Sequence, residues 1–257
     1  MTLSYDEKPR MNENTGKWLK VYLKCFINAV LDFRNVYPQE SFDWTTYQAF
    51  NLPRHIPINR HPQVSQYIET LIEDLLSKLG NIRTFNLNIV RCDDRACIEN
   101  YAIDFSELRH WDTELVSETE VFDELRSSLN GLLSQLEKLP KIKPGTVTFE
   151  IIIEGPDLNL GREAGRVLNE TEKRHLEQNV NWTKTGENQF QGKITNSELG
   201  NEIQGFGPKV KLTSIAGCDS GPIVFYVYTQ RIIAPKDSQL LDIYESYSQE
   251  EFQLSLP

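Results

Sequence analysis

The stretch from Val36 to Ile68, VYPQESFDWTTYQAFNLPRHIPINRHPQVSQYI, decides how this chain is organised. Pro53, Pro57 and Pro62 fix their own backbone angle and disfavour helix in the residue before them. We therefore expect an extended connection that joins two helices. The stretch contains no combination of nucleophile, acid and base that would mark a catalytic centre.

Three segments have the apolar spacing of helices that pack on a core. The segment Lys17–Val36, which Pro38 would stop, is apolar around most of its circumference, so it is expected at the centre of the fold. A second helix is expected from Pro62 or Gln63 to Leu79, and a third from Glu118 to Leu139. Ser117 and Glu120 have the spacing of a capping box at the start of the third helix.

Strand patterns follow the second and third helices. Alternating residues in Thr84–Ile89 and Tyr101–Phe105 predict an antiparallel hairpin, and Thr146–Glu154, Lys209–Ile215 and Pro222–Ile233 are further strand candidates. The sequence therefore predicts an α+β fold, in which three helices pack on a mostly antiparallel sheet.

Polar segments divide the chain. Residues 1–16 are expected to be a flexible tail, residues 17–154 a core, residues 155–233 a long polar segment and the last strands of the same domain, and residues 234–257 a flexible acidic tail. A polar segment of about fifty residues is long for a loop inside a compact domain, so it is either functional or disordered.

Composition narrows the function. With 27 basic and 37 acidic residues, the net charge of −10 disfavours direct binding of nucleic acid. The four cysteines, Cys25, Cys92, Cys97 and Cys218, match neither a metal knuckle nor a disulfide framework. We find no hydrophobic run of membrane-spanning length and no signal-peptide pattern, so we expect no membrane partner and a cytosolic or nuclear location.

Patterns of catalysis are scarce. The four histidines are scattered, no phosphate-binding glycine loop is present, and acidic pairs such as Asp93 and Asp94 are expected to be turn residues. We predict no catalytic residue, no cofactor and no metal. A hydrolase built on Cys218 or Ser220 is an alternative, but a hairpin turn explains those residues better. Trp182, in the polar segment, either fixes that segment or contacts a ligand.

Eight segments of the chain resemble the HORMA-domain accessory subunits of translesion DNA polymerase zeta, of fungal type. These segments are spread over the whole predicted fold. They are Trp18–Cys25, Arg34–Pro38, Tyr47–Pro62, Asp104–Leu108, Thr119–Glu124, Arg126–Asn130, Leu136–Pro140 and Lys211–Ser214.

The resemblance implies a HORMA fold and a nuclear, non-catalytic adaptor for translesion synthesis after DNA damage. Residues 155–233 would form a mobile "seatbelt" around an extended, proline-containing peptide from the catalytic subunit. Tyr67 and Trp182 correspond to residues that contact the peptide. Arg126 lies at a position that corresponds to the dimerisation helix of the family, through which two copies of the protein pair on one catalytic chain.

The resemblance also implies a surface for the translesion scaffold polymerase, a deoxycytidyl transferase. The residues expected there are Leu212, Phe225, Tyr226 and Tyr228. An alternative within the same fold is a spindle-checkpoint or meiotic HORMA adaptor, which would prefer a different partner peptide.

Overall fold

The structure, a computed structural model, describes residues 13–43, 49–52, 55–108, 117–155, 182, 209–221, 223–233 and 242–245. Tyr47, Pro53 and the predicted tail up to residue 12 lie outside these ranges, as does the predicted seatbelt from 156 to 208 apart from Trp182. No helix in the described ranges is long and apolar enough to cross a bilayer.

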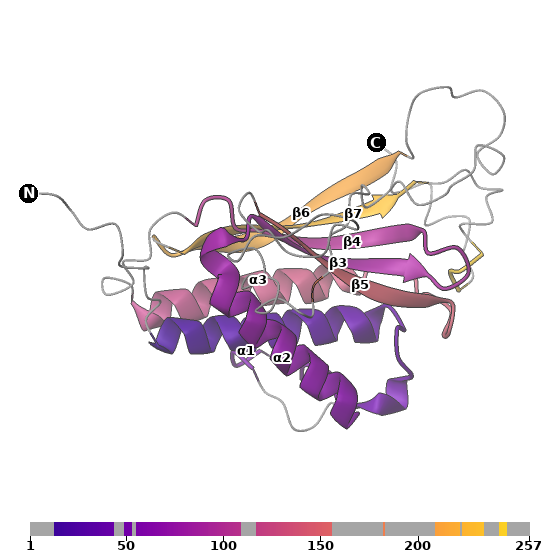
Figure 1. The fold of residues 1–257 in the computed structure, drawn as a ribbon, viewed down its shortest axis with the longest axis horizontal. Coiled ribbons are helices and arrows are strands. Elements are labelled where there is room, and N and C mark those ends of the chain that lie inside the picture. The colour runs from indigo at the N-terminus through magenta and orange to yellow at the C-terminus, as the bar shows by residue number, and fades with distance from the viewer. Residues whose placement is uncertain are drawn as a thin grey trace, which may run out of the picture.

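Within these ranges, the helices lie on one side of a five-stranded antiparallel sheet (Figure 1). The helices are α1 (Glu13–Phe33), α2 (Pro62–Lys78) and α3 (Glu118–Leu136). The strands of the large sheet are β3 (Thr84–Arg91), β4 (Cys97–Asp104), β5 (Val147–Glu154), β6 (Val210–Asp219) and β7 (Val224–Ile232), in the spatial order β5-β3-β4-β7-β6. Two short strands, β1 (Phe42–Asp43) and β2 (Ile58–Asn59), pair within the connection between α1 and α2.

The end of α1 differs from the prediction. Asn35 adopts a left-handed conformation with φ 51°, and the N–H of Val36 donates to the carbonyl of Leu31 at 3.0 Å. The N–H of Asn35 donates to the carbonyl of Asp32 at 3.0 Å. These two bonds form a Schellman motif, which satisfies carbonyls of the last helical turn. Asn35 therefore ends the helix, before Pro38 is reached.

α1 is the centre of the core, as its apolar circumference predicts. Tyr22 and Phe26 are fully buried. The Tyr22 hydroxyl lies 2.8 Å from the Ser128 hydroxyl of α3, which joins the two helices.

The capping box predicted for α3 is not formed, because Ser117 occupies the N-cap position without a side-chain capping bond. The Glu118 carboxylate instead accepts a hydrogen bond from the indole of Trp18 at 2.9 Å.

The predicted β3–β4 hairpin is present, and β6 extends past Ile215 to Asp219. The register of β6 against β7 shifts between Ile215 and Cys218. Gly217 lies at this bulge, where a Cβ atom would stand 2.0 Å from the carbonyl oxygen of Phe225. The bulge therefore requires glycine.

The C-terminal part of the chain also differs from the prediction. Ile243 and Tyr244, within the range 234–257 that was expected to be flexible, are 8% and 7% exposed. Tyr244 forms a β-bridge with Ile142, in the connection between α3 and β5. The prediction of a flexible tail is therefore wrong for residues 242–245, because the side chains of Ile243 and Tyr244 are buried in the core.

Candidate functional site

β5 forms one edge of the sheet and pairs with β3 on its inner side alone, among the strands described. An edge strand presents main-chain N–H and C=O groups that an extended segment can bind. The neighbouring strand β3 is buried over its whole length, whereas six of the eight residues of β5 are only half-buried. Among the described residues, β5 is therefore an edge strand with partly exposed side chains, the kind of strand to which an extended segment can add.

An aromatic cluster stands beside this edge. The ring of Phe149 on β5 lies 6.1 Å from that of Tyr67 on α2 and 6.3 Å from that of Tyr37, which follows α1. Both pairs are edge-to-face, the arrangement that aromatic quadrupoles favour. Tyr67 is 47% exposed, so about half of its side chain is available to a partner. Partial burial raises the pKa of Tyr67 above its ordinary value, with a contribution from Tyr37.

Trp182 reaches the same helix. Its indole N–H donates to the carboxylate of Asp74 on α2, and Asp74 also pairs with Lys78 one turn further on. Asp74 lies two helical turns after Tyr67, on the same side of α2 and about 10 Å along its axis. The structure therefore brings both predicted peptide-binding residues, Tyr67 and Trp182, to α2.

The residues expected to face the scaffold polymerase divide between two faces of the sheet. Leu212 and Tyr226 are 59% and 54% exposed, and the strand pairing places them with Tyr228 on the face away from the helices. Phe225 is 1% exposed and packs between Tyr22 and Phe105 on the helix side. The prediction for Phe225 is therefore wrong, because successive residues of a strand point to opposite faces.

Arg126 lies on the exposed side of α3, and its guanidinium donates to the carbonyl of Asn51 at 3.4 Å. This exposure leaves it available to a partner. The hydrolase alternative loses support, since Cys218 and Ser220 are both 2% exposed. Burial raises the pKa of the Cys218 thiol to about 12, which disfavours the thiolate that a nucleophile requires. The described residues contain no group of three side chains that could hold a metal ion.

Three residues of this site were not singled out from the sequence: Tyr37, Phe149 and Asp74. The sequence patterns around Phe149 and Tyr37 are those of ordinary core residues. The spacing of seven residues between Tyr67 and Asp74 would have placed them on one helix face. It could not show that Trp182, more than a hundred residues later, binds there.

The chain was compared with known proteins. The DNA polymerase zeta processivity subunit of Saccharomyces cerevisiae is 46% identical over 246 residues, which are 94% of this chain and 97% of that protein. A chain of the mitotic checkpoint complex has a TM-score of 0.57 at 11% identity, covering 86% of this chain and 100% of that one. The C. elegans protein HTP-1 bound to HTP-3 motif-1 has a TM-score of 0.54 at 12% identity, covering 91% of this chain and 100% of that one. No family model matches the chain.

The fold is thus the α+β HORMA fold, as the sequence predicts. At 11–12% identity, the checkpoint and meiotic structures share this fold alone. The extended identity with the yeast subunit is more specific, and the chain belongs to the family of DNA polymerase zeta processivity subunits. The predicted link to polymerase zeta is confirmed, and the spindle-checkpoint or meiotic alternative is not favoured.

Proposed function

We propose that this protein is a non-catalytic, nuclear adaptor of DNA polymerase zeta that clamps an extended peptide of the catalytic subunit on the edge of β5. The observation that carries the proposal is the edge position of β5, among the described strands, beside the half-exposed Tyr67. An extended ligand at such an edge gains main-chain hydrogen bonds, while its side chains fill neighbouring pockets. The aromatic cluster of Tyr37, Tyr67 and Phe149 offers apolar surface for a proline ring.

The course of the chain supports enclosure of the peptide. β5 ends at Glu154 on one edge of the sheet, and β6 begins at Val210 on the other. Between these points the chain has to pass from edge to edge of a sheet about 20 Å wide. Trp182, within this connection, donates a hydrogen bond to Asp74 of α2, the helix whose Tyr67 contacts Phe149 on β5. A peptide on β5 would then lie inside a loop of the chain, and release would require the loop to open.

Calorimetric titration with the proline-containing segment of the same organism's catalytic subunit tests this proposal. We expect Tyr67→Ala to raise the Kd by about tenfold or more, as loss of a central aromatic contact does. Trp182→Ala is expected to raise the Kd as well, because it removes the bond to Asp74 that links the enclosing loop to α2. Tyr226→Ala is the matched control, because Tyr226 is similarly exposed but lies on β7, away from the β5 edge. Equal affinity in all variants, with their folds intact by circular dichroism, would refute the site.

Main-chain pairing has a separate test. N-methylation of alternate residues of the peptide removes amide donors without changing its side chains. If the peptide adds a strand to β5, methylation in one register is expected to weaken binding strongly, and methylation in the other register much less. An equal effect in both registers would contradict strand addition.

We further propose that Leu212, Tyr226 and Tyr228 form a second surface, which binds the translesion scaffold polymerase. Two large, exposed apolar side chains on one sheet face support a protein contact there. Leu212→Arg is expected to abolish binding of that polymerase and to leave peptide affinity unchanged. A loss of both activities would point to misfolding instead.

For the exposed Arg126, we propose a contact with a second copy of the protein. In sedimentation experiments with a catalytic-subunit fragment that carries two peptide segments, Arg126→Ala is expected to lower the affinity for the second copy. Glu120→Ala, an exposed change earlier on the same helix, serves as the control. Unchanged binding of the second copy by Arg126→Ala would contradict this assignment.

A further inference from the structure

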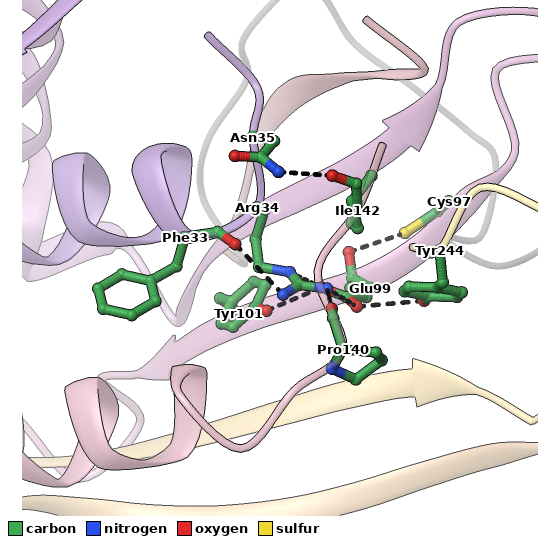
Figure 2. A network of polar contacts seen from close by, with 9 residues as sticks. All are labelled: Phe33, Arg34, Asn35, Cys97, Glu99, Tyr101, Pro140, Ile142 and Tyr244. Carbon is green, nitrogen blue, oxygen red and sulfur yellow. Dashed lines mark hydrogen bonds and ion pairs between the residues drawn. The ribbon is translucent and has the colours of Figure 1, made fainter. Parts of the chain in front are cut away.

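A buried carboxylate on β4 accepts four hydrogen bonds from three side chains (Figure 2). Glu99 binds the Arg34 guanidinium through two hydrogen bonds of 2.8 Å, and the Tyr101 hydroxyl donates to it at 2.8 Å. The side chains of Arg34 and Glu99 are 1% and 2% exposed. Burial alone would lower the pKa of Arg34, but the Glu99 carboxylate outweighs burial and holds this pKa above its ordinary value.

The fourth donor is the hydroxyl of Tyr244, which lies 3.2 Å from the Glu99 carboxylate. Tyr244 belongs to residues 242–245, here called the C-terminal latch. The latch forms a short antiparallel ladder with residues 141–143. The N–H of Lys143 donates to the carbonyl of Ile243 at 2.7 Å, and the N–H of Glu245 donates to the carbonyl of Lys141 at 2.8 Å.

The latch follows β7, the last strand of the sheet, in the chain. β7 pairs with β4, and Glu99 stands opposite Arg231 in that pairing. Residues 233–241 then connect β7 to the latch, a span of at most about 30 Å. The latch is attached to residues 141–143, just before β5. The last two strands are therefore held to the core by β4, by the packing of side chains such as Phe225 on the helix side, and by the latch that follows them in the chain.

Release of the latch would not leave the buried charge of Glu99 without hydrogen-bond partners. Without Tyr244, Glu99 keeps both bonds to Arg34 and the bond from Tyr101. The contact is also small, since it buries two apolar side chains and forms a ladder of two main-chain bonds. Segments of this kind open at a lower free energy than the global unfolding of a domain.

We propose that the C-terminal latch is a conformational lock that controls the separation of β6 and β7 from β4. The inference rests on the proposed clamp for its purpose, because separation of these strands would open the loop around the peptide. With the latch docked, β6 and β7 stay on β4 and the peptide is retained. With the latch released, these strands open more often and the peptide leaves faster.

Hydrogen exchange of the full-length protein, without peptide, tests the lock itself. We expect Tyr244→Ala to speed exchange in β6 and β7 on the order of tenfold or more, because it removes both the buried ring and a hydrogen bond to a charged group. Exchange in β3 and β5 should stay unchanged. Tyr244→Phe keeps the ring and should give a smaller increase in the same strands. Glu245→Ala is the matched control, since that side chain is exposed while its main-chain bond is kept.

Two results would overturn the lock: no increase in β6 and β7, or an equal increase in all five strands, which would mean only lower global stability. A second measurement follows peptide dissociation, which Tyr244→Ala is expected to accelerate by a similar factor. If the parent protein binds no peptide, the proposed clamp fails, while hydrogen exchange still decides whether the latch holds β6 and β7. If peptide binds but dissociates at the same rate from both proteins, the lock is refuted and the clamp stands.

Discussion

Asp32, in the last turn of α1, has a charge that the fold does not favour. Asp32 is only 2% exposed, and burial raises the pKa of its carboxyl group from 3.8 to about 6. A hydrogen bond of 3.2 Å from the side-chain amide of Gln39 acts in the opposite direction and lowers this pKa. The carboxyl end of a helix also disfavours a negative charge. We therefore expect Asp32→Asn, which is nearly isosteric and neutral, to stabilise the protein at neutral pH.

The magnitude follows from linkage. Because the pKa is higher in the folded state than in the unfolded one, the folded state binds the proton more tightly. The resulting stability is complete below about pH 4 and is lost as the pH rises through about 6. A pKa difference of about two units corresponds to about 3 kcal/mol. The variant should gain up to about 3 kcal/mol over the parent protein at about pH 7, and almost nothing at about pH 4.

Urea unfolding of both proteins at several pH values measures this difference in the free energy of unfolding. Asp123→Asn, at an exposed position of α3, is the control for the removal of one carboxylate. An Asp32→Asn gain that is equal at acid and neutral pH would refute the ionisation argument. A loss of stability at neutral pH would show that the charge of Asp32 is itself favourable.

Three further predictions concern packing and exposure. Glu99→Leu should lower the free energy of unfolding in urea by about 3–5 kcal/mol, because it leaves the charge of Arg34 buried without a partner carboxylate. The double variant with Arg34→Met should recover much of that loss, and equal losses in the single and double variants would argue against a charge effect. Gly217→Ala should lower the melting temperature, since its Cβ would meet the carbonyl of Phe225 at 2.0 Å, and an unchanged value would mean that the bulge can shift. Cys92 is the exposed one of four free cysteines, so alkylation of the folded protein, followed by mass spectrometry, should modify it first; early labelling of another cysteine would contradict the described packing.

Much of the fold could be predicted because its patterns are local. The apolar spacing of α1, α2 and α3 and the alternation of β3 and β5 follow from helical and strand periods. Boundaries depend on single residues such as Asn35, whose left-handed conformation ends α1 ahead of Pro38. The capping box of α3 failed for a similar reason. Suitable residue types were present, but Ser117 does not form the bond.

The sequence by itself determined the element types, the absence of a catalytic pattern and, by resemblance, the HORMA family. Only the tertiary structure decided which face of β7 is covered, and hence that Tyr226 is exposed while Phe225 is buried. Alternation supplies the period of a strand but not its phase against the core. Tertiary structure alone also brought Trp182 to Asp74 and Tyr244 to Glu99. Each of these pairs is separated by more than a hundred residues, and no local pattern encodes the packing that brings such residues together.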